Sequence, residues 1–97
     1  MSLPVILDPE ARAEFDEAYD WYQAEMGRGE AFAREVRQVF DRIGSMPRMH
    51  APVVGDVRKA VVRRFPYCVY YREESDCVRV LAVFHTRRHP SGWQDRV

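Results

Sequence analysis

The fold is decided by residues 67–86, YCVYYREESDCVRVLAVFHT, where two apolar runs flank the short acidic stretch EESD. Tyrosine, valine, leucine and phenylalanine dominate both runs, and such residues favour β-strands. The predicted strands span 67–72 and 77–86, and the four residues between them are short enough for a hairpin. A hairpin of this length is expected to place Tyr71 opposite Val78.

Two amphipathic helices precede this hairpin, over residues 9–26 and about 30–43, because apolar side chains recur there at helical spacing. Asp8 is the expected N-cap of the first helix, and Pro9 is its first residue. Gly27 ends that helix, so the two helices form an αα-hairpin with one apolar stripe each.

A short apolar strand at residues 5–7 and a further strand at 57–64 complete the expected order, β-α-α-β-β-β, in a single domain of residues 1–97. The predicted fold is α+β with two layers, in which the helical hairpin packs on one face of a mostly antiparallel four-stranded sheet. Because the two helices return the chain to its starting end, we expect the first strand to run antiparallel to the second.

Composition fits a small cytoplasmic domain. The apolar fraction is 46%, and 15 basic side chains balance 15 acidic ones. No run is long and apolar enough to span a membrane, and the first residues lack the pattern of a secretory leader. Residues 1–47 carry ten acidic and five basic side chains, whereas residues 48–97 carry the reverse. This division indicates either an anionic partner for the C-terminal half or an acidic helical layer that balances a basic sheet.

The cysteines and histidines predict neither a disulfide nor a metal site. Cys68 and Cys77 fall in different cross-strand pairs, too far apart to be joined. The three histidines lack the cysteine or carboxylate neighbours of a zinc site, and no glycine-rich phosphate loop is present. We therefore expect neither a metal nor another cofactor.

The strand registers predict which side chains share the sheet face turned away from the helices. The expected members are Lys59, Val61, Arg63, Tyr70, Arg72, Arg79, Leu81, Val83, His85 and Arg87. Cations around an apolar floor are typical of a contact surface. The candidates for binding a partner or target are Lys59, Val61, Tyr70, Arg72, Arg79, Leu81, Val83 and Trp93. Alternatively, the C-terminal segment folds back and covers this floor with Trp93.

A second candidate site is the basic cluster after the last strand. His85 is able to exchange a proton near neutral pH, and Arg63, Arg87 and Arg88 are suited to holding a phosphodiester. Together they predict a site for metal-free general acid–base cleavage. The alternative is a basic strand end with a purely structural role.

An ordered set of residues over nearly the whole chain resembles the RelE/ParE superfamily of bacterial toxins. The set comprises Phe15-x-x-Ala18-x-x-Trp21-Tyr22, Phe32, Ile43-x-x-x-Pro47, Arg63-Arg64-Phe65-Pro66-Tyr67-x-Val69-x-Tyr71 and Val80-x-Ala82-Val83-x-His85-x-Arg87-Arg88-x-Pro90-x-x-Trp93-x-x-Arg96. The resemblance implies the toxin half of a type II toxin–antitoxin module, of the kind also called plasmid stabilisation proteins. It implies a cognate antitoxin as partner, with a homodimer as an alternative when the antitoxin is absent.

The superfamily contains two mechanisms, and the resemblance favours the ParE-like one. ParE-like members inhibit growth by binding DNA gyrase, whereas RelE-like members cut mRNA on the ribosome with basic residues and a C-terminal tyrosine or histidine. In this chain, Cys68 and Thr86 stand where RelE-like nucleases have arginine, and Trp93 is the C-terminal aromatic residue. A RelE-like endonuclease using His85 remains the first alternative, and an inactive, antitoxin-binding remnant is the second.

Overall fold

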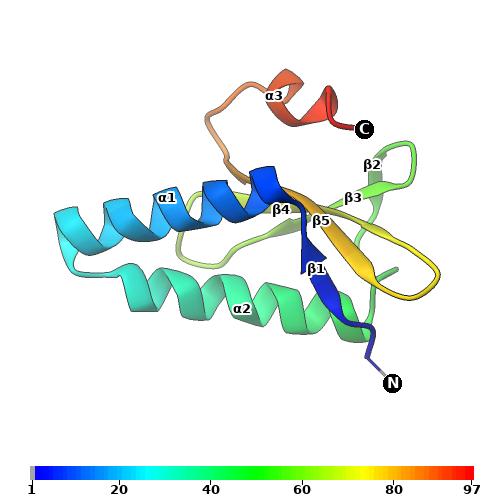
Figure 1. The fold of residues 1–97 in the computed structure, drawn as a ribbon, viewed down its shortest axis with the longest axis horizontal. Coiled ribbons are helices and arrows are strands. Elements are labelled where there is room, and N and C mark those ends of the chain that lie inside the picture. Colours follow the sequence, from blue (N-terminus) through cyan, green and yellow to red (C-terminus); the bar gives the residue numbers. More distant parts are fainter. Residues whose placement is uncertain (1) are drawn as a thin grey trace.

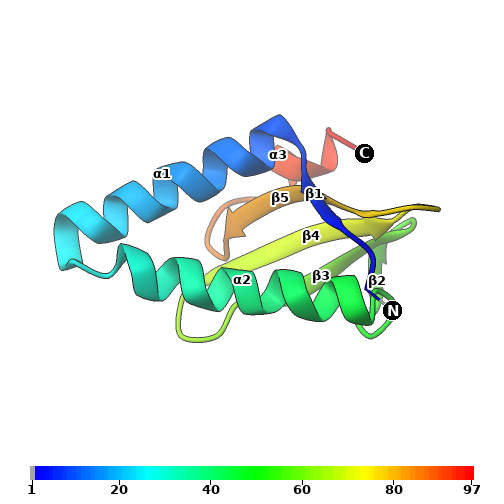
Figure 2. The same ribbon diagram turned by 60° about the horizontal axis from the view of Figure 1, so that its bottom comes forward.

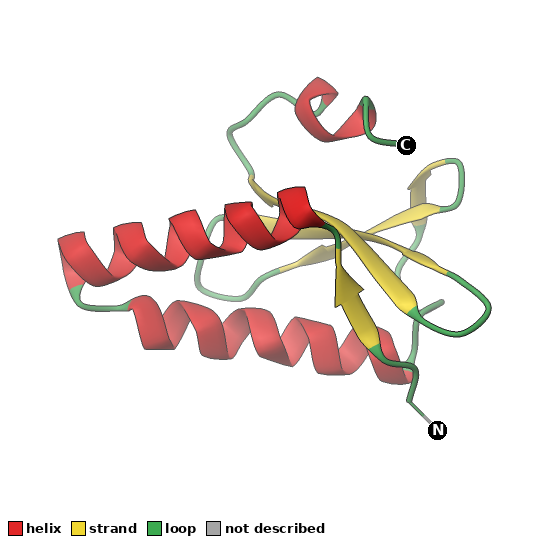
Figure 3. Ribbon diagram, viewed as in Figure 1, coloured by secondary structure: helices red, strands yellow, loops and turns green. Residues whose placement is uncertain are grey.

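Two layers make up the fold, in which α1 and α2 lie side by side over one face of a sheet (Figures 1 and 2). The computed structural model describes residues 2–97, and Met1, part of the segment considered for a leader, lies outside them. The elements are β1 (Val5–Leu7), α1 (Pro9–Met26), α2 (Gly29–Ser45), β2 (Pro52–Val54), β3 (Val57–Val61), β4 (Tyr67–Glu73), β5 (Val78–His85) and α3 (Ser91–Gln94). The predicted α+β fold is confirmed (Figure 3).

The sheet has five strands in the order β1-β5-β4-β3-β2, one more than predicted. The extra strand, β2, pairs with β3 across the turn at Gly55, whose φ is 54°. This added reversal changes the direction of everything that follows it. As a result β1 pairs parallel to β5 and runs in the same direction as β3. Our expectation that β1 runs antiparallel to the strand beginning at Val57 is therefore wrong.

The ends of α1 follow the predicted residues, with one difference in the capping contact. Gly27 adopts a φ of 62°, and its N–H donates to the carbonyl of Gln23 at 3.2 Å, which ends the helix as predicted. Asp8 occupies the N-cap position, but its carboxylate caps no helical N–H. Instead the Asp8 carboxylate accepts a hydrogen bond from Arg79 Nη1 at 3.1 Å, because the Arg79 side chain extends from β5 to the start of α1.

The core lies between the helical hairpin and the sheet. Phe32 of α2 is fully buried and stacks on Tyr22 of α1, with ring centroids 5.2 Å apart. Val69 and Tyr71 of β4 are also fully buried in this cluster. Each such side chain contributes about 2 kcal/mol by leaving water. Within residues 2–97, neither long helix has the apolar length needed to cross a bilayer.

A β-bulge interrupts the central pair of strands. Tyr71 of β4 lies opposite Val80 of β5, two residues from the expected register, which leaves the faces unchanged. The next residue, Tyr70, lies opposite Ala82, so Leu81 is the additional residue of the bulge.

The bulge reverses the predicted faces for the second half of β5. Val83 lies opposite Val69 and packs in the helix-side core, and His85 lies opposite Tyr67 at the same end. We expected both Val83 and His85 on the face turned away from the helices, and that expectation is wrong. Ala82, which follows the additional residue of the bulge, belongs to the face turned away from the helices.

The face turned away from the helices is covered by the C-terminal segment. We call its buried residues the outer cluster: Val57, Cys68, Tyr70, Leu81, Ala82, Phe84 and Trp93. The Trp93 ring stacks on Tyr70 with centroids 4.0 Å apart, and α3 stands apart from the long helices (Figure 1). The alternative that Trp93 covers this floor is therefore confirmed.

Glu14 of α1 anchors the C-terminal segment to the sheet. Its carboxylate accepts hydrogen bonds from Arg96 at 3.1 and 2.8 Å and from the backbone N–H of Val83 at 3.0 Å. Arg96 also donates to the carbonyl of Leu81 at 3.0 Å. Strand β1 pairs with β5 only as far as Val80. Beyond that point, the side chains of Glu14 and Arg96 provide the hydrogen-bond partners of the Val83 N–H and the Leu81 carbonyl on the edge of β5.

We expect Trp93→Ala to lower the free energy of unfolding by about 3 kcal/mol, because a large side chain that is 2% exposed leaves a cavity. Trp21→Ala is the matched control, since Trp21 is 55% exposed and its loss should cost about 0.5 kcal/mol. Denaturant unfolding of both variants checks this. Equal losses would contradict the role given to Trp93.

We expect Glu14→Ala to cost about 2 kcal/mol, because it leaves Arg96 and the Val83 N–H without their acceptor. Hydrogen exchange at the Val83 amide should accelerate at the same time. Glu17→Ala, one turn along α1 and exposed, is the control and should change neither quantity measurably. An unchanged Val83 exchange rate in Glu14→Ala would show that the anchor is unimportant.

Candidate functional site

A groove of about 650 Å³ lies between α1 and one end of the sheet. At this end the β3–β4 turn meets the segment that follows β5, and the Thr86 N–H donates to the carbonyl of Pro66 at 2.8 Å. The bulge in β5 directs Val83 and His85 toward this groove. The groove is therefore built by segments that are far apart in the sequence.

The groove has an apolar, largely aromatic floor. Tyr22, Phe65 and Tyr67 line it, with the Tyr22 and Phe65 rings edge to face at 4.9 Å. Trp21 and Met26 also line it, and both are more than half exposed. Exposed aromatic and methionine side chains beside a buried apolar floor are typical of surfaces that bind another protein.

Three arginines border the groove without a carboxylate partner. Arg28 lies over the Phe65 ring at 5.2 Å, Arg64 belongs to the β3–β4 turn, and Arg87 follows β5. None of the three forms an ion pair within the part of the chain that the structure describes. Their charges are therefore available to a ligand.

The side of the groove formed by α1 is acidic. Glu17 is exposed, whereas Glu14 is mostly buried and engaged by Arg96, with Arg88 at 3.6 Å. The groove thus has carboxylates along α1 and guanidinium groups along the sheet end. Because Glu17 is the carboxylate of the described lining that no cation pairs with, an acidic ligand group is favoured beside the arginines and disfavoured beside Glu17.

His85 has a defined tautomer. Its Nδ1 accepts a hydrogen bond from the Arg87 backbone N–H at 3.0 Å, and its ring packs edge to face on Tyr67 at 5.1 Å. The neutral imidazole consequently carries its proton on Nε2 and has no free nitrogen with which to accept another. Burial raises the pKa of the neighbouring Tyr67, which stays protonated at neutral pH. This geometry is poorly suited to a general base.

The predicted catalytic residues are only partly brought together. His85, Arg87 and Arg88 all line the groove, but Arg63 does not, and its neighbour Arg64 is there instead. Sequence reasoning missed Arg64 because two adjacent arginines in a turn carry no signal for which one faces the groove. Arg28 was missed as well, because an arginine in the turn between two helices carries no sequence signal that it reaches the β3–β4 turn.

Most of the residues predicted to bind a partner or target are either paired with carboxylates of this chain or buried. Arg72 pairs with Asp56 at 3.2 Å, and Arg79 pairs with Asp8 at 3.1 Å and with Glu74 at 3.2 Å. The apolar candidates Tyr70, Leu81 and Trp93 lie in the outer cluster, and Val83 lies on the other face. Lys59 and Val61 remain exposed, Val61 by 58%.

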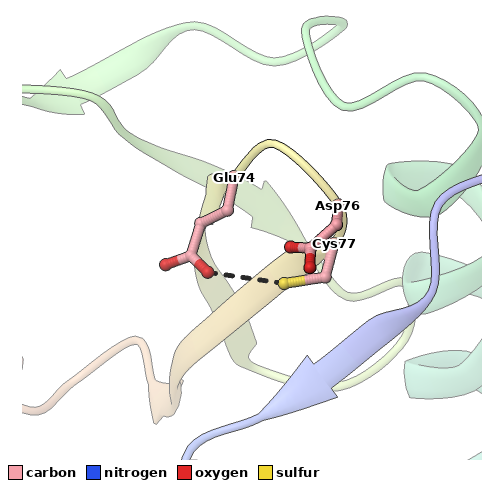
Figure 4. A group of neighbouring side chains, drawn as sticks. All are labelled: Glu74, Asp76 and Cys77. Carbon is pink, nitrogen blue, oxygen red and sulfur yellow. Dashed lines mark hydrogen bonds between the residues drawn. The ribbon is translucent and has the colours of Figure 1, made fainter.

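Glu74, Asp76 and Cys77 gather at the β4–β5 turn (Figure 4). The Cys77 thiol donates to the Glu74 carboxylate at 3.4 Å, and Arg79 Nε donates to the same carboxylate at 3.2 Å. Burial, followed by this contact with Glu74, raises the pKa of Cys77 and keeps it a thiol. Cys68 and Cys77 are both free and buried. The cluster braces the turn, and the Glu74 carboxylate is already neutralised by Arg79.

Comparison with known proteins agrees with this architecture. Residues 5–90 match the family described as the ParE toxin of the type II toxin–antitoxin system, parDE. No curated protein matched the chain. A solved structure titled "Chromosomal ParDE TA system from P. aeruginosa" aligns with a TM-score of 0.75 and 17% identity, covering 87% of this chain and 96% of that one. At that identity the structural likeness shows the fold, and the family match over most of the chain shows that it belongs to the ParE toxin family of type II toxin–antitoxin systems.

Proposed function

We propose that the chain is a ParE-like toxin that acts in the cytoplasm, inhibits growth by binding DNA gyrase and is neutralised by a cognate antitoxin. The observation that carries this proposal is the family match over residues 5–90. The environment of His85 argues against its use as the base in RNA cleavage, since its Nδ1 already accepts a hydrogen bond from the Arg87 N–H.

The groove is the proposed antitoxin site. Its floor is apolar and aromatic, and its two sides carry opposite charges, which suits an amphipathic protein segment. Such a segment would bury Trp21 and Met26, the most exposed large apolar side chains beside the groove. Burial of the two would favour the complex by several kcal/mol before the cost of ordering the segment, which is of similar size.

The proposed surface for the target is the exposed part of β3 that carries Lys59 and Val61. It lies outside the groove, so one partner does not have to exclude the other by direct overlap. A cation beside an exposed aliphatic side chain on a strand near the sheet edge offers both attraction to an anionic surface and a small apolar contact.

Expression of the chain without antitoxin is expected to stop growth and induce the response to DNA damage. The purified protein is expected to inhibit supercoiling by gyrase in vitro, and primer extension on translated messages should reveal no new cleaved ends. Cleaved messages with fully active gyrase would instead support the endonuclease. Unimpaired growth, with folded protein present in the cells, would support an antitoxin-binding remnant.

Val61→Asp is expected to raise at least tenfold the inducer concentration that is needed to inhibit growth. Its affinity for the antitoxin should stay within twofold of that of the unaltered chain. The physical reason is that an aspartate at this exposed position introduces a charge that must be desolvated on target binding. Ile6→Asp is the control, since Ile6 is 43% exposed on β1 at the opposite edge of the sheet. Equal effects of the two variants would remove the β3 surface from the proposal.

A further inference from the structure

Arg64 has a backbone conformation that suits glycine better than arginine. Its φ is 71°, and among residues 2–97 it is the only non-glycine residue with a positive φ. The other two positions of this kind are Gly27 and Gly55. A side chain in this region clashes with its own backbone, whereas glycine adopts it freely. The sequence therefore keeps an arginine where glycine would be the more stable choice.

Among residues 2–97, no hydrogen bond or ion pair of the Arg64 side chain compensates for this strain. The turn is closed by backbone hydrogen bonds, from Val62 N–H to the Tyr67 carbonyl at 3.0 Å and from Tyr67 N–H to the Phe65 carbonyl at 2.8 Å. Neither bond involves the side chain of Arg64, which is exposed. In residues 2–97 that side chain makes no hydrogen bond or ion pair. Strained residues of this kind typically occur where a side chain serves binding.

The surroundings of Arg64 define what it could bind. It lines the groove together with Arg28 and Arg87, next to the aromatic floor, and faces a site whose α1 side carries the exposed Glu17. A guanidinium beside an apolar surface forms strong, bidentate hydrogen bonds with a carboxylate. Several unpaired guanidiniums on one side indicate a ligand with an acidic flank.

We propose that Arg64 is the specificity-determining contact of the groove and donates two hydrogen bonds to a carboxylate on an amphipathic segment of the antitoxin. The inference rests on the proposed function and adds the chemistry of the partner. The segment has an apolar side that fills the floor and an acidic flank that faces Arg64, Arg28 and Arg87. Its opposite flank, which faces Glu17, is neutral or basic.

The test compares Arg64→Gly, Arg64→Lys and Arg64→Glu with Arg63→Gly and Arg63→Glu. Arg63 is the matched control, because it is the adjacent exposed arginine, has no positive φ and does not line the groove. The probe is the antitoxin encoded beside the toxin, titrated by calorimetry into each refolded variant. Thermal unfolding of each free variant is measured in parallel.

Arg64→Gly is expected to leave the unfolding midpoint unchanged or raised, since the strain is relieved, and to weaken antitoxin binding at least tenfold. Arg64→Glu should weaken antitoxin binding further. Arg64→Lys should recover only part of the loss, because it keeps the positive charge but its ammonium cannot bind a carboxylate in a bidentate manner. Both Arg63 variants should bind within twofold of the unaltered chain. The difference between Arg64→Gly and the unaltered chain should shrink at high salt.

Three results would overturn the inference. The first is antitoxin affinity in Arg64→Gly within twofold of the unaltered chain. The second is a clearly lowered unfolding midpoint in Arg64→Gly, which would give Arg64 a structural role. The third is Arg64-dependent binding of a single-stranded RNA oligonucleotide, which would assign the arginines to nucleic acid. Failure of the unaltered chain to bind the antitoxin would instead contradict the proposed function itself.

Discussion

The bulge at Leu81 is the constraint on which the rest of the structure depends. Strand β5 is buried on both faces, so each side chain along it must match either the helical layer or the outer cluster. One additional residue in the strand moves each later side chain of β5 to the face opposite the one it would otherwise occupy. Val83 thereby supports the floor of the groove, Phe84 packs beneath the C-terminal segment, and His85 reaches the end of the groove.

Patterns that repeat along the chain could be predicted from the sequence, and single local irregularities could not. Helical spacing located α1 and α2, and Gly27 located the turn between them. Hairpin spacing located β4 and β5 with the correct faces near their connection. The bulge lies in a run of apolar residues, LAVF, in which either register buries hydrophobic surface. Because both registers satisfy the hydrophobic pattern, the pattern could not select one.

The extra strand β2 shows the same limit at the level of topology. Its residues Pro52–Val54 are exposed, and a proline at its start reads as a loop. Nevertheless the pairing with β3 reverses the chain once more and decides that β1 and β5 are parallel. The inference that the helical hairpin returns the chain to its start was correct for β2, and it failed for β3 only because of this strand.

The net charge of zero does not reveal which basic side chains are paired with carboxylates. Arg79 and Arg96 pair with Asp8 and Glu14 at the N-terminal end of α1, which agrees with an acidic helical layer balancing a basic sheet, whereas Arg72 pairs with Asp56 of the β2–β3 turn. Arg64 and Arg87 of the C-terminal half, together with Arg28 of the N-terminal half, have no such partner in the described chain and border one groove.

Glu14 belongs both to the groove and to the anchor of the C-terminal segment, and its contacts are unequal. Arg96 binds its carboxylate at 2.8 and 3.1 Å and is largely buried, whereas Arg88 lies at 3.6 Å and is exposed. A bidentate, partly buried pair is worth far more than a long exposed one. The Arg88 guanidinium also lies 4.0 Å over the Phe84 ring, so this contact, more than Glu14, sets its position. The C-terminal segment is therefore held to α1 and the sheet mainly by Arg96 and by the stacking of Trp93 on Tyr70.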